Sequence, residues 1–117
     1  MPIGDVWDVM KDQRLVVGAL ATAIPVTKTA DFTLADNETF VISDRAATNT
    51  VTLPAAASCP GRIVVIKTIQ AQTVVSASSN VIPRIGGSAG TAILAATDGA
   101  WALLVSNGTA WEAMAGN

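Results

Sequence analysis

The last third of the chain alternates short apolar runs with two turn dipeptides. Asp98-Gly99 and Asn107-Gly108 separate apolar runs at residues 92–96, 100–106 and 109–114. Asn-Gly and Asp-Gly favour tight hairpins, because a type I′ turn needs two residues with positive φ and these residues tolerate it best. The pattern therefore predicts three consecutive antiparallel strands.

Shorter runs of the same kind fill the middle of the chain. Strands are predicted at residues 31–34, 38–43, 50–53, 62–69, 72–77 and 81–82. Phe40 and Ile42 are expected on the inner face of their strand, because side chains two apart point the same way. Eight or nine short strands separated by turn signals indicate an all-β fold, a small antiparallel β-sandwich or barrel-like domain.

The run at residues 62–69, RIVVIKTI, is the most β-prone stretch of the chain. It is apolar on both faces of the predicted strand, whereas a strand with one wet face would alternate apolar and polar residues. We therefore expect it to be buried on two sides, either centrally in a sandwich or at a subunit interface.

The first 27 residues lack this punctuation and are predicted to form an N-terminal arm or connector, with the β domain at residues 28–117. The polar stretch 1–14 is interpreted either as a short helix or as an extended arm that orders on a partner. Trp7 either anchors the arm in a pocket on another surface or folds back onto its own domain.

Residues 15–27 are apolar and rich in small side chains. They are interpreted as a connector or buried arm leading into the β domain. The alternative is a short helix at 15–23, which Pro25 would end, because the residue before proline is pushed out of the helical region.

The high hydrophobic content indicates that the chain works as part of an assembly. Of the 117 residues, 50% are hydrophobic and 14% are charged, and the mean hydropathy is +0.47. A chain of this size buries only about two-thirds of its unfolded surface on folding. A membrane or other protein chains must cover the surplus. The longest apolar run, residues 15–26, is shorter than the roughly 20 residues that a spanning helix needs, so oligomerisation is expected and a membrane partner is not.

Charge and reactive side chains exclude several functions. The net charge is −2, and the seven basic residues form no stripe, so no nucleic-acid partner is expected. Asp5, Asp8 and Asp12 make the leader acidic, unlike a secretory signal. The chain has no histidine and Cys59 is its single cysteine. We therefore expect no catalytic residues, no metal site, no cofactor and no enzymatic activity.

Two features superficially suggest ligands. The loop at residues 86–90 is rich in glycine but lacks the Lys-Ser/Thr end of a phosphate-binding loop. Trp101 and Trp111 lie on adjacent predicted strands and could form a sugar-binding platform across the Asn107-Gly108 hairpin. Few acids or amides surround them, so we favour core or interface anchors.

Several short motifs resemble a module of tailed-bacteriophage virion proteins. They are TVTLPAA at residues 50–56, PGR at 60–62 leading into IVVIKTI, IGG at 85–87, and SNGTAW at 106–111. The resemblance covers roughly residues 31–114 and includes tail fibres, head fibres and capsid-decoration proteins. It implies a β-rich, commonly trimeric module without enzymatic activity. The length of 117 residues fits a capsid-decoration (cement) protein better than a long fibre.

This resemblance suggests two interfaces. Apolar strand faces would pack chains into a homotrimer through Ile63, Val65, Ile66, Trp101 and Trp111. The arm would bind the phage major capsid protein through Val6, Trp7, Met10 and Leu15 and stabilise the head. The protein would be made in the host cytoplasm and would lie on the capsid surface of the virion. The alternatives are a tail, neck or head fibre component that contacts the host surface or glycans, and a carbohydrate-binding module unconnected with virions.

Overall fold

The fold is built from β-strands. A computed structural model describes residues 23–117, and all structural statements below concern these residues. No helix in this part of the chain is long and apolar enough to cross a membrane. The strands are β1 (Val26–Lys28), β2 (Phe32–Thr33), β3 (Phe40–Ser43), β4 (Asn49–Thr52), β5 (Ile63–Thr68), β6 (Val74–Ser76), β7 (Val81–Ile82), β8 (Ala92–Leu94), β9 (Trp101–Ser106) and β10 (Trp111–Gly116), with one 3₁₀ turn, η1 (Ala56–Ser58).

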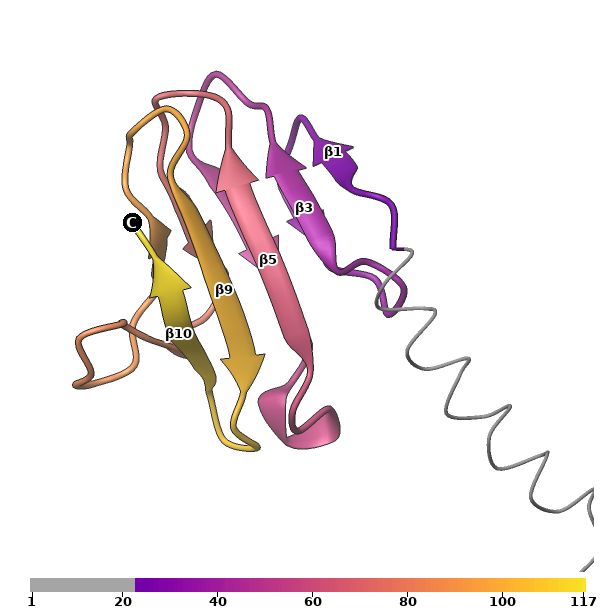
Figure 1. Cartoon of the computed structure of the whole chain (residues 1–117), viewed down its shortest axis with the longest axis vertical. Coiled ribbons are helices and arrows are strands. Elements are labelled where there is room, and N and C mark those ends of the chain that lie inside the picture. Colours follow the sequence, from indigo (N-terminus) through magenta and orange to yellow (C-terminus); the bar gives the residue numbers. More distant parts are fainter. Residues whose placement is uncertain (1–22) are drawn as a thin grey trace, which may run out of the picture.

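The strands form two sheets. A six-stranded sheet has the order β1-β3-β5-β9-β10-β7, and a four-stranded sheet has the order β2-β4-β6-β8. In Figure 1 the labelled strands of the six-stranded sheet face the viewer, and the four-stranded sheet lies behind them. The all-β prediction is confirmed, and β1 begins two residues before the predicted start of the β domain.

The chain alternates between the two sheets from β1 to β9. Each passage through both sheets is one coil. From β1 to β6 each coil stacks on the previous one with parallel pairing. In the six-stranded sheet Val26 lies beside Val41, and Val41 beside Ile66. In the four-stranded sheet Phe32 lies beside Val51 in the same way. Parallel neighbours need a crossover connection, and a strand of the opposite sheet supplies it here.

The expectation of an antiparallel domain is therefore wrong. The pairs β1–β3, β3–β5, β2–β4, β4–β6 and β7–β10 are parallel. Only β5–β9, β9–β10 and β6–β8 are antiparallel. Both sheets are mixed, because the chain winds between them before it closes with a hairpin.

One of the two predicted C-terminal hairpins is confirmed. Asn107-Gly108 joins β9 to β10, and the Asn107 side-chain oxygen accepts hydrogen bonds from the N–H groups of Thr109 and Ala110, at 2.8 Å each. Gly108 has φ = 89°, but no residue other than glycine has a positive φ in the described part of the chain, so the connecting loop, residues 107–110, is not the type I′ turn that the dipeptide predicts. Asp98-Gly99 instead carries the chain from β8 in one sheet to β9 in the other, so the predicted three-stranded meander is wrong.

A single hydrophobic core joins both sheets. Val51, Val74 and Leu94 enter it from the four-stranded sheet. Ile66 and Trp111 enter it from the six-stranded sheet. Trp111 is fully buried, and its indole N–H donates a 2.9 Å hydrogen bond to the Pro54 carbonyl. This bond ties the last strand to the loop after β4.

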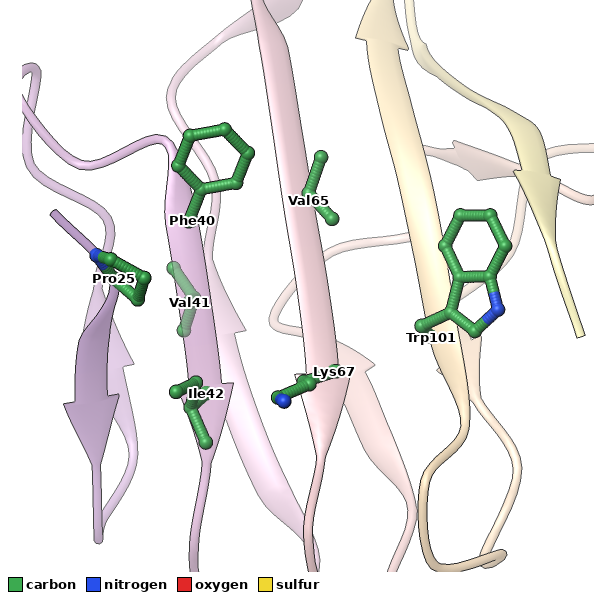
Figure 2. A pocket seen from close by; sticks show the side chains of 7 residues that line it. All are labelled: Pro25, Phe40, Val41, Ile42, Val65, Lys67 and Trp101. Atoms are coloured by element: carbon green, nitrogen blue, oxygen red, sulfur yellow. The ribbon is translucent and has the colours of Figure 1, made fainter. Parts of the chain in front are cut away.

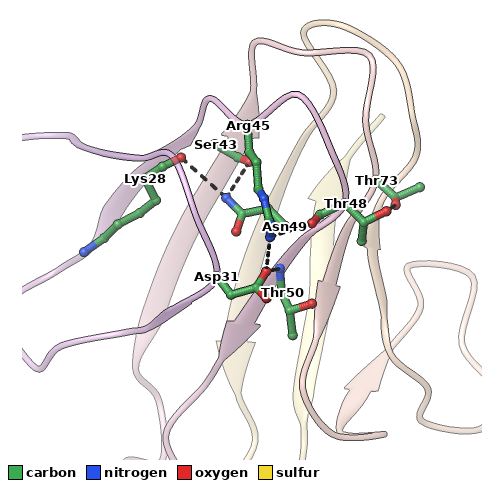
Figure 3. A network of polar contacts seen from close by, with 8 residues as sticks. All are labelled: Lys28, Asp31, Ser43, Arg45, Thr48, Asn49, Thr50 and Thr73. Carbon is green, nitrogen blue, oxygen red and sulfur yellow. Dashed lines mark hydrogen bonds and ion pairs between the residues drawn. The ribbon is translucent and has the colours of Figure 1, made fainter.

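Part of the interior of the first coil is polar. Asn49 is fully buried, and its amide nitrogen donates to the Ser43 hydroxyl at 3.0 Å and to the Lys28 carbonyl at 3.4 Å (Figure 3). At the surface beside it, the Asp31 carboxylate pairs with Arg45 and accepts the Thr50 N–H at 2.8 Å. These contacts join β1, β3 and β4 and fix the winding of the first coil.

Strand β3 faces opposite to the prediction. Val41 and Ser43 are buried, whereas Phe40 and Ile42 are on the outer face. The buried serine is accommodated because it accepts the hydrogen bond from Asn49. Two large apolar side chains are therefore placed on the surface of the six-stranded sheet.

Candidate interaction surface

The outer face of the six-stranded sheet is apolar across its three central strands, β3, β5 and β9. The register places Phe40 beside Val65 and Val65 beside Leu103. Of the eight outward positions of these strands, only Lys67 is charged. We call these eight residues the outer apolar face: Phe40, Ile42, Ile63, Val65, Lys67, Trp101, Leu103 and Val105.

The area of this face follows from strand geometry. Three strands spaced about 4.8 Å apart, with four residues in β3 and six each in β5 and β9 at about 3.3 Å per residue, cover on the order of 250–300 Å². The largest apolar patch on a typical monomeric protein covers roughly 300–600 Å² and is often functional, so this face is close to the lower end of that range.

Part of the face is hollowed into a groove of about 310 Å³. Figure 2 shows the lining side chains on the neighbouring strands β3, β5 and β9, with Pro25 at the edge of the sheet. The groove is lined by Pro25, Phe40, Val41, Ile42, Val65, Lys67 and Trp101. Its floor and walls are hydrocarbon, with the Lys67 ammonium as the single charged group.

The two cations beside β3 and at the start of β5 already have partners. Lys28 and Glu38 form an ion pair of 2.7 Å next to β3, and Arg62 donates hydrogen bonds to the carbonyls of Ala35 and Glu38. Lys67 has no ion-pair partner among residues 23–117. The only charge in the groove is therefore available to an incoming group.

Glu38 titrates below its ordinary range. Burial raises the pKa of its carboxyl group, but a hydrogen bond from Lys28, one from the Ala35 N–H and the nearby charge of Arg62 lower it. The favourable contacts outweigh burial, so the pKa of Glu38 is lowered. This carboxylate stays ionised as part of the scaffold beside the groove.

Three of the predicted interface residues lie on the outer apolar face. Ile63 and Val65 are half-buried, and Trp101 is 38% exposed. Ile66 and Trp111 do not belong to the surface, because both are fully buried in the core of a single chain. Their assignment to an oligomer interface is corrected: Ile66 alternates with outward residues on a strand that is apolar on both faces, and Trp111 is the buried neighbour of Glu112 on β10.

Trp101 and Trp111 do not form a paired platform. Trp111 lies beside Ser106 at the hairpin end of β9, whereas Trp101 is at the other end of that strand, beside Lys67. Trp111 points into the core, so only Trp101 is available at the surface.

Pattern reasoning missed four apolar residues of the surface. Phe40, Ile42, Leu103 and Val105 belong to it, yet Phe40 and Ile42 were expected inside. The available signal was the run of apolar residues on both faces, which residues 40–42 and 102–105 share with residues 62–69. The predicted arm residues Val6, Trp7, Met10 and Leu15 lie outside the described residues.

The described residues offer little reactive chemistry. Within residues 23–117, no group of three or more metal-ligating side chains comes together. The Cys59 thiol is half-buried and lies 3.4 Å from the Ala55 carbonyl oxygen. Comparison of the chain with protein-family models, curated proteins and solved structures finds no match.

Proposed function

We propose that this protein is a non-enzymatic structural protein of a tailed-bacteriophage virion, a homotrimeric capsid decoration protein. The observation that carries the proposal is the outer apolar face, which residues 23–117 leave partly exposed. The proposed location on a virion rests on sequence motifs that resemble phage virion modules. They lie at residues 50–56, 60–69 and 106–111.

In this proposal the outer apolar face seals copies of the chain together. Ile63, Val65 and Trp101 remain in the interface, and Phe40, Ile42 and Leu103 join them. Burial of this face, on the order of 250–300 Å² per chain, would contribute on the order of 7 kcal/mol before association costs. We also propose that the two sheets pack face to face as a β-sandwich, because one core cluster draws inward residues from both.

The arm supplies the second interface. Val6, Trp7, Met10 and Leu15 bind the major capsid protein at a junction between capsomers, with Trp7 as the anchor. Three weak arms on one trimer bind more tightly than one, because each attachment raises the effective concentration of the next. Bridging capsomers strengthens the shell. This role needs no nucleic acid, membrane or cofactor.

Self-association is tested by the solution mass of the purified chain, measured by light scattering. We expect three chain masses for the native protein. Val65→Glu, which puts a carboxylate into the outer apolar face, should yield the single chain. Val75→Glu is the matched control, because Val75 is a half-buried outward valine in the middle of β6 on the other sheet. A single-chain mass for the native protein contradicts the proposal.

Location is tested on particles. Antibodies raised against the chain and imaged on virions of the source phage should label the whole head. Label confined to the tail would contradict decoration and favour the fibre alternative. Particles without label would remove the virion assignment altogether.

A further inference from the structure

The described chain starts at the rim of the groove. Pro25 lines the groove, and Ile24 directly before it has 80% of its surface exposed. Residues 16–22, VVGALAT, precede this point, lie outside the described residues and contain no charged side chain. An apolar segment and an apolar groove are thus adjacent in the same protein.

The outer apolar face is too small to form a stable interface between copies by itself. The face covers on the order of 250–300 Å². A standard stable interface buries about 800 Å² on each partner. Flat contact between two such faces therefore falls well short, and a segment lying in the groove would add contact on both of its sides.

We infer that residues 16–22 of one copy occupy the groove of a neighbouring copy, so that each chain donates one segment and accepts another. The inference rests on the proposed self-association and names the segment that completes it. A neighbour's groove is preferred to the chain's own, because Pro25 already lines the rim of its own groove and a segment entering that groove would have to reverse direction directly before Pro25.

The lengths are compatible with exchange. The groove extends from Pro25 beside β1 to Trp101 on β9, which is three strand spacings, or about 14 Å. Seven residues span at most about 25 Å. The segment is therefore long enough to cross the groove and leave a few residues to bridge the two copies.

Donor and acceptor are different parts of the surface, which makes the contact heterologous. Such contacts form closed rings when the rotation between copies closes. A three-membered ring satisfies every groove and every segment, in keeping with the proposed trimer. The capsid-binding residues up to Leu15 stay outside this contact and remain available to the shell.

Disulfide trapping tests the exchange in the full chain. Cys59→Ser removes the native thiol, Val65→Cys places a thiol in the groove, and Val17→Cys, Ala19→Cys or Ala21→Cys, one at a time, places a thiol on the segment. Mild oxidation should link chains into covalent dimers and trimers for at least one of the three positions, visible on a non-reducing gel.

Val75→Cys in place of Val65→Cys is the control, because it moves the groove thiol to the outer face of the four-stranded sheet. This control should remain a single-chain band. Equal cross-linking of the two proteins, or a bond confined within one chain, would overturn the inference.

Light scattering of the Cys59→Ser protein tests self-association separately from the exchange of residues 16–22. A trimer that forms no Val65 cross-link at any segment position overturns the exchange and leaves the proposed self-association standing. A single-chain mass contradicts the proposed function and the exchange together.

Discussion

Trp111 is buried and Trp101 is partly exposed, so we expect the first to support folding stability and the second to support self-association. Trp111 is fully buried and hydrogen-bonded to the Pro54 carbonyl, so Trp111→Ala should lower the free energy of unfolding by about 3–5 kcal/mol. Trp101 is 38% exposed, so Trp101→Ala should cost on the order of 0.5–1 kcal/mol in the dilute single chain. Denaturant unfolding measures both values.

The same pair checks the assignment of surface and core. Trp101→Ala should also weaken self-association, measured by light scattering across a dilution series, because its indole forms one wall of the groove. A larger loss of folding stability from Trp101→Ala than from Trp111→Ala would show that their surroundings have been misassigned.

Glu38 predicts a pH dependence of stability. Its pKa is lowered in the folded chain, so its ion pair with Lys28 stabilises the fold fully above the ordinary glutamate pKa of about 4.3. That contribution is lost as the pH falls through the lowered folded pKa. Unfolding free energies measured between pH 3 and 7 should therefore decline at the acid end.

Glu38→Gln should flatten this decline while keeping an acceptor for the Ala35 N–H, which bonds to the Glu38 side chain at 2.8 Å. Glu112→Gln is the matched control, since Glu112 forms no ion pair among residues 23–117. An acid decline of undiminished size in Glu38→Gln would contradict the assignment.

At the scale of elements, the end of β10 depends on a glycine. Gly116 has φ = 152°, and a Cβ there would lie 2.4 Å from the Trp101 carbonyl oxygen. Gly116→Ala must therefore push β10 away from β9, and we expect a loss of about 1–3 kcal/mol in unfolding free energy. Gly90→Ala serves as the control, because a Cβ there meets nothing within 4 Å. Similar losses in both variants would argue against close packing at this strand end.

The two turn dipeptides of the C-terminal third carry the same local signal but connect their strands differently. Asn107-Gly108 encodes its hairpin locally, because the Asn107 side chain caps the turn and glycine supplies the positive φ. Asp98-Gly99 carries the same signal and a positive φ at Gly99, yet the following strand joins the other sheet. A turn dipeptide specifies a change of direction and leaves the partner strand undetermined.

The parallel stacking could not be predicted from local pattern. Val41 pairs with Ile66, 25 positions later, across a connection that contains a strand of the other sheet. Strand propensity reports that a residue suits a pleated surface and carries no information about a partner so far away.

The residues of the candidate site could be predicted only in part, because the sequence does not show which face of a strand points into the core. Of the residues predicted for an interface, Ile63, Val65 and Trp101 lie on the outer face of the sheet, whereas Ile66 and Trp111 lie in the core. Where both faces of a strand are apolar, hydrophobicity cannot distinguish inside from outside. In β3 a buried Ser43 even reverses the usual preference, through its hydrogen bond with Asn49.

For the whole molecule, the arm and the β domain should be separable. Deletion of residues 1–14 should abolish binding to purified capsids while the chain stays folded and oligomeric, because residues 16–22 and the outer apolar face remain. Co-sedimentation with capsids and light scattering measure the two properties. Full occupancy of capsids by the shortened chain would contradict the role of the arm.

The winding between sheets also determines how this chain must fold. Neighbouring strands in the coils are separated by an intervening strand of the other sheet, so long loops close before their contacts form. The β9–β10 hairpin is the local exception and can form within microseconds. Proteins dominated by non-local pairing fold in roughly milliseconds to seconds, so newly made chains expose their apolar strands for that time and are vulnerable to aggregation while they do.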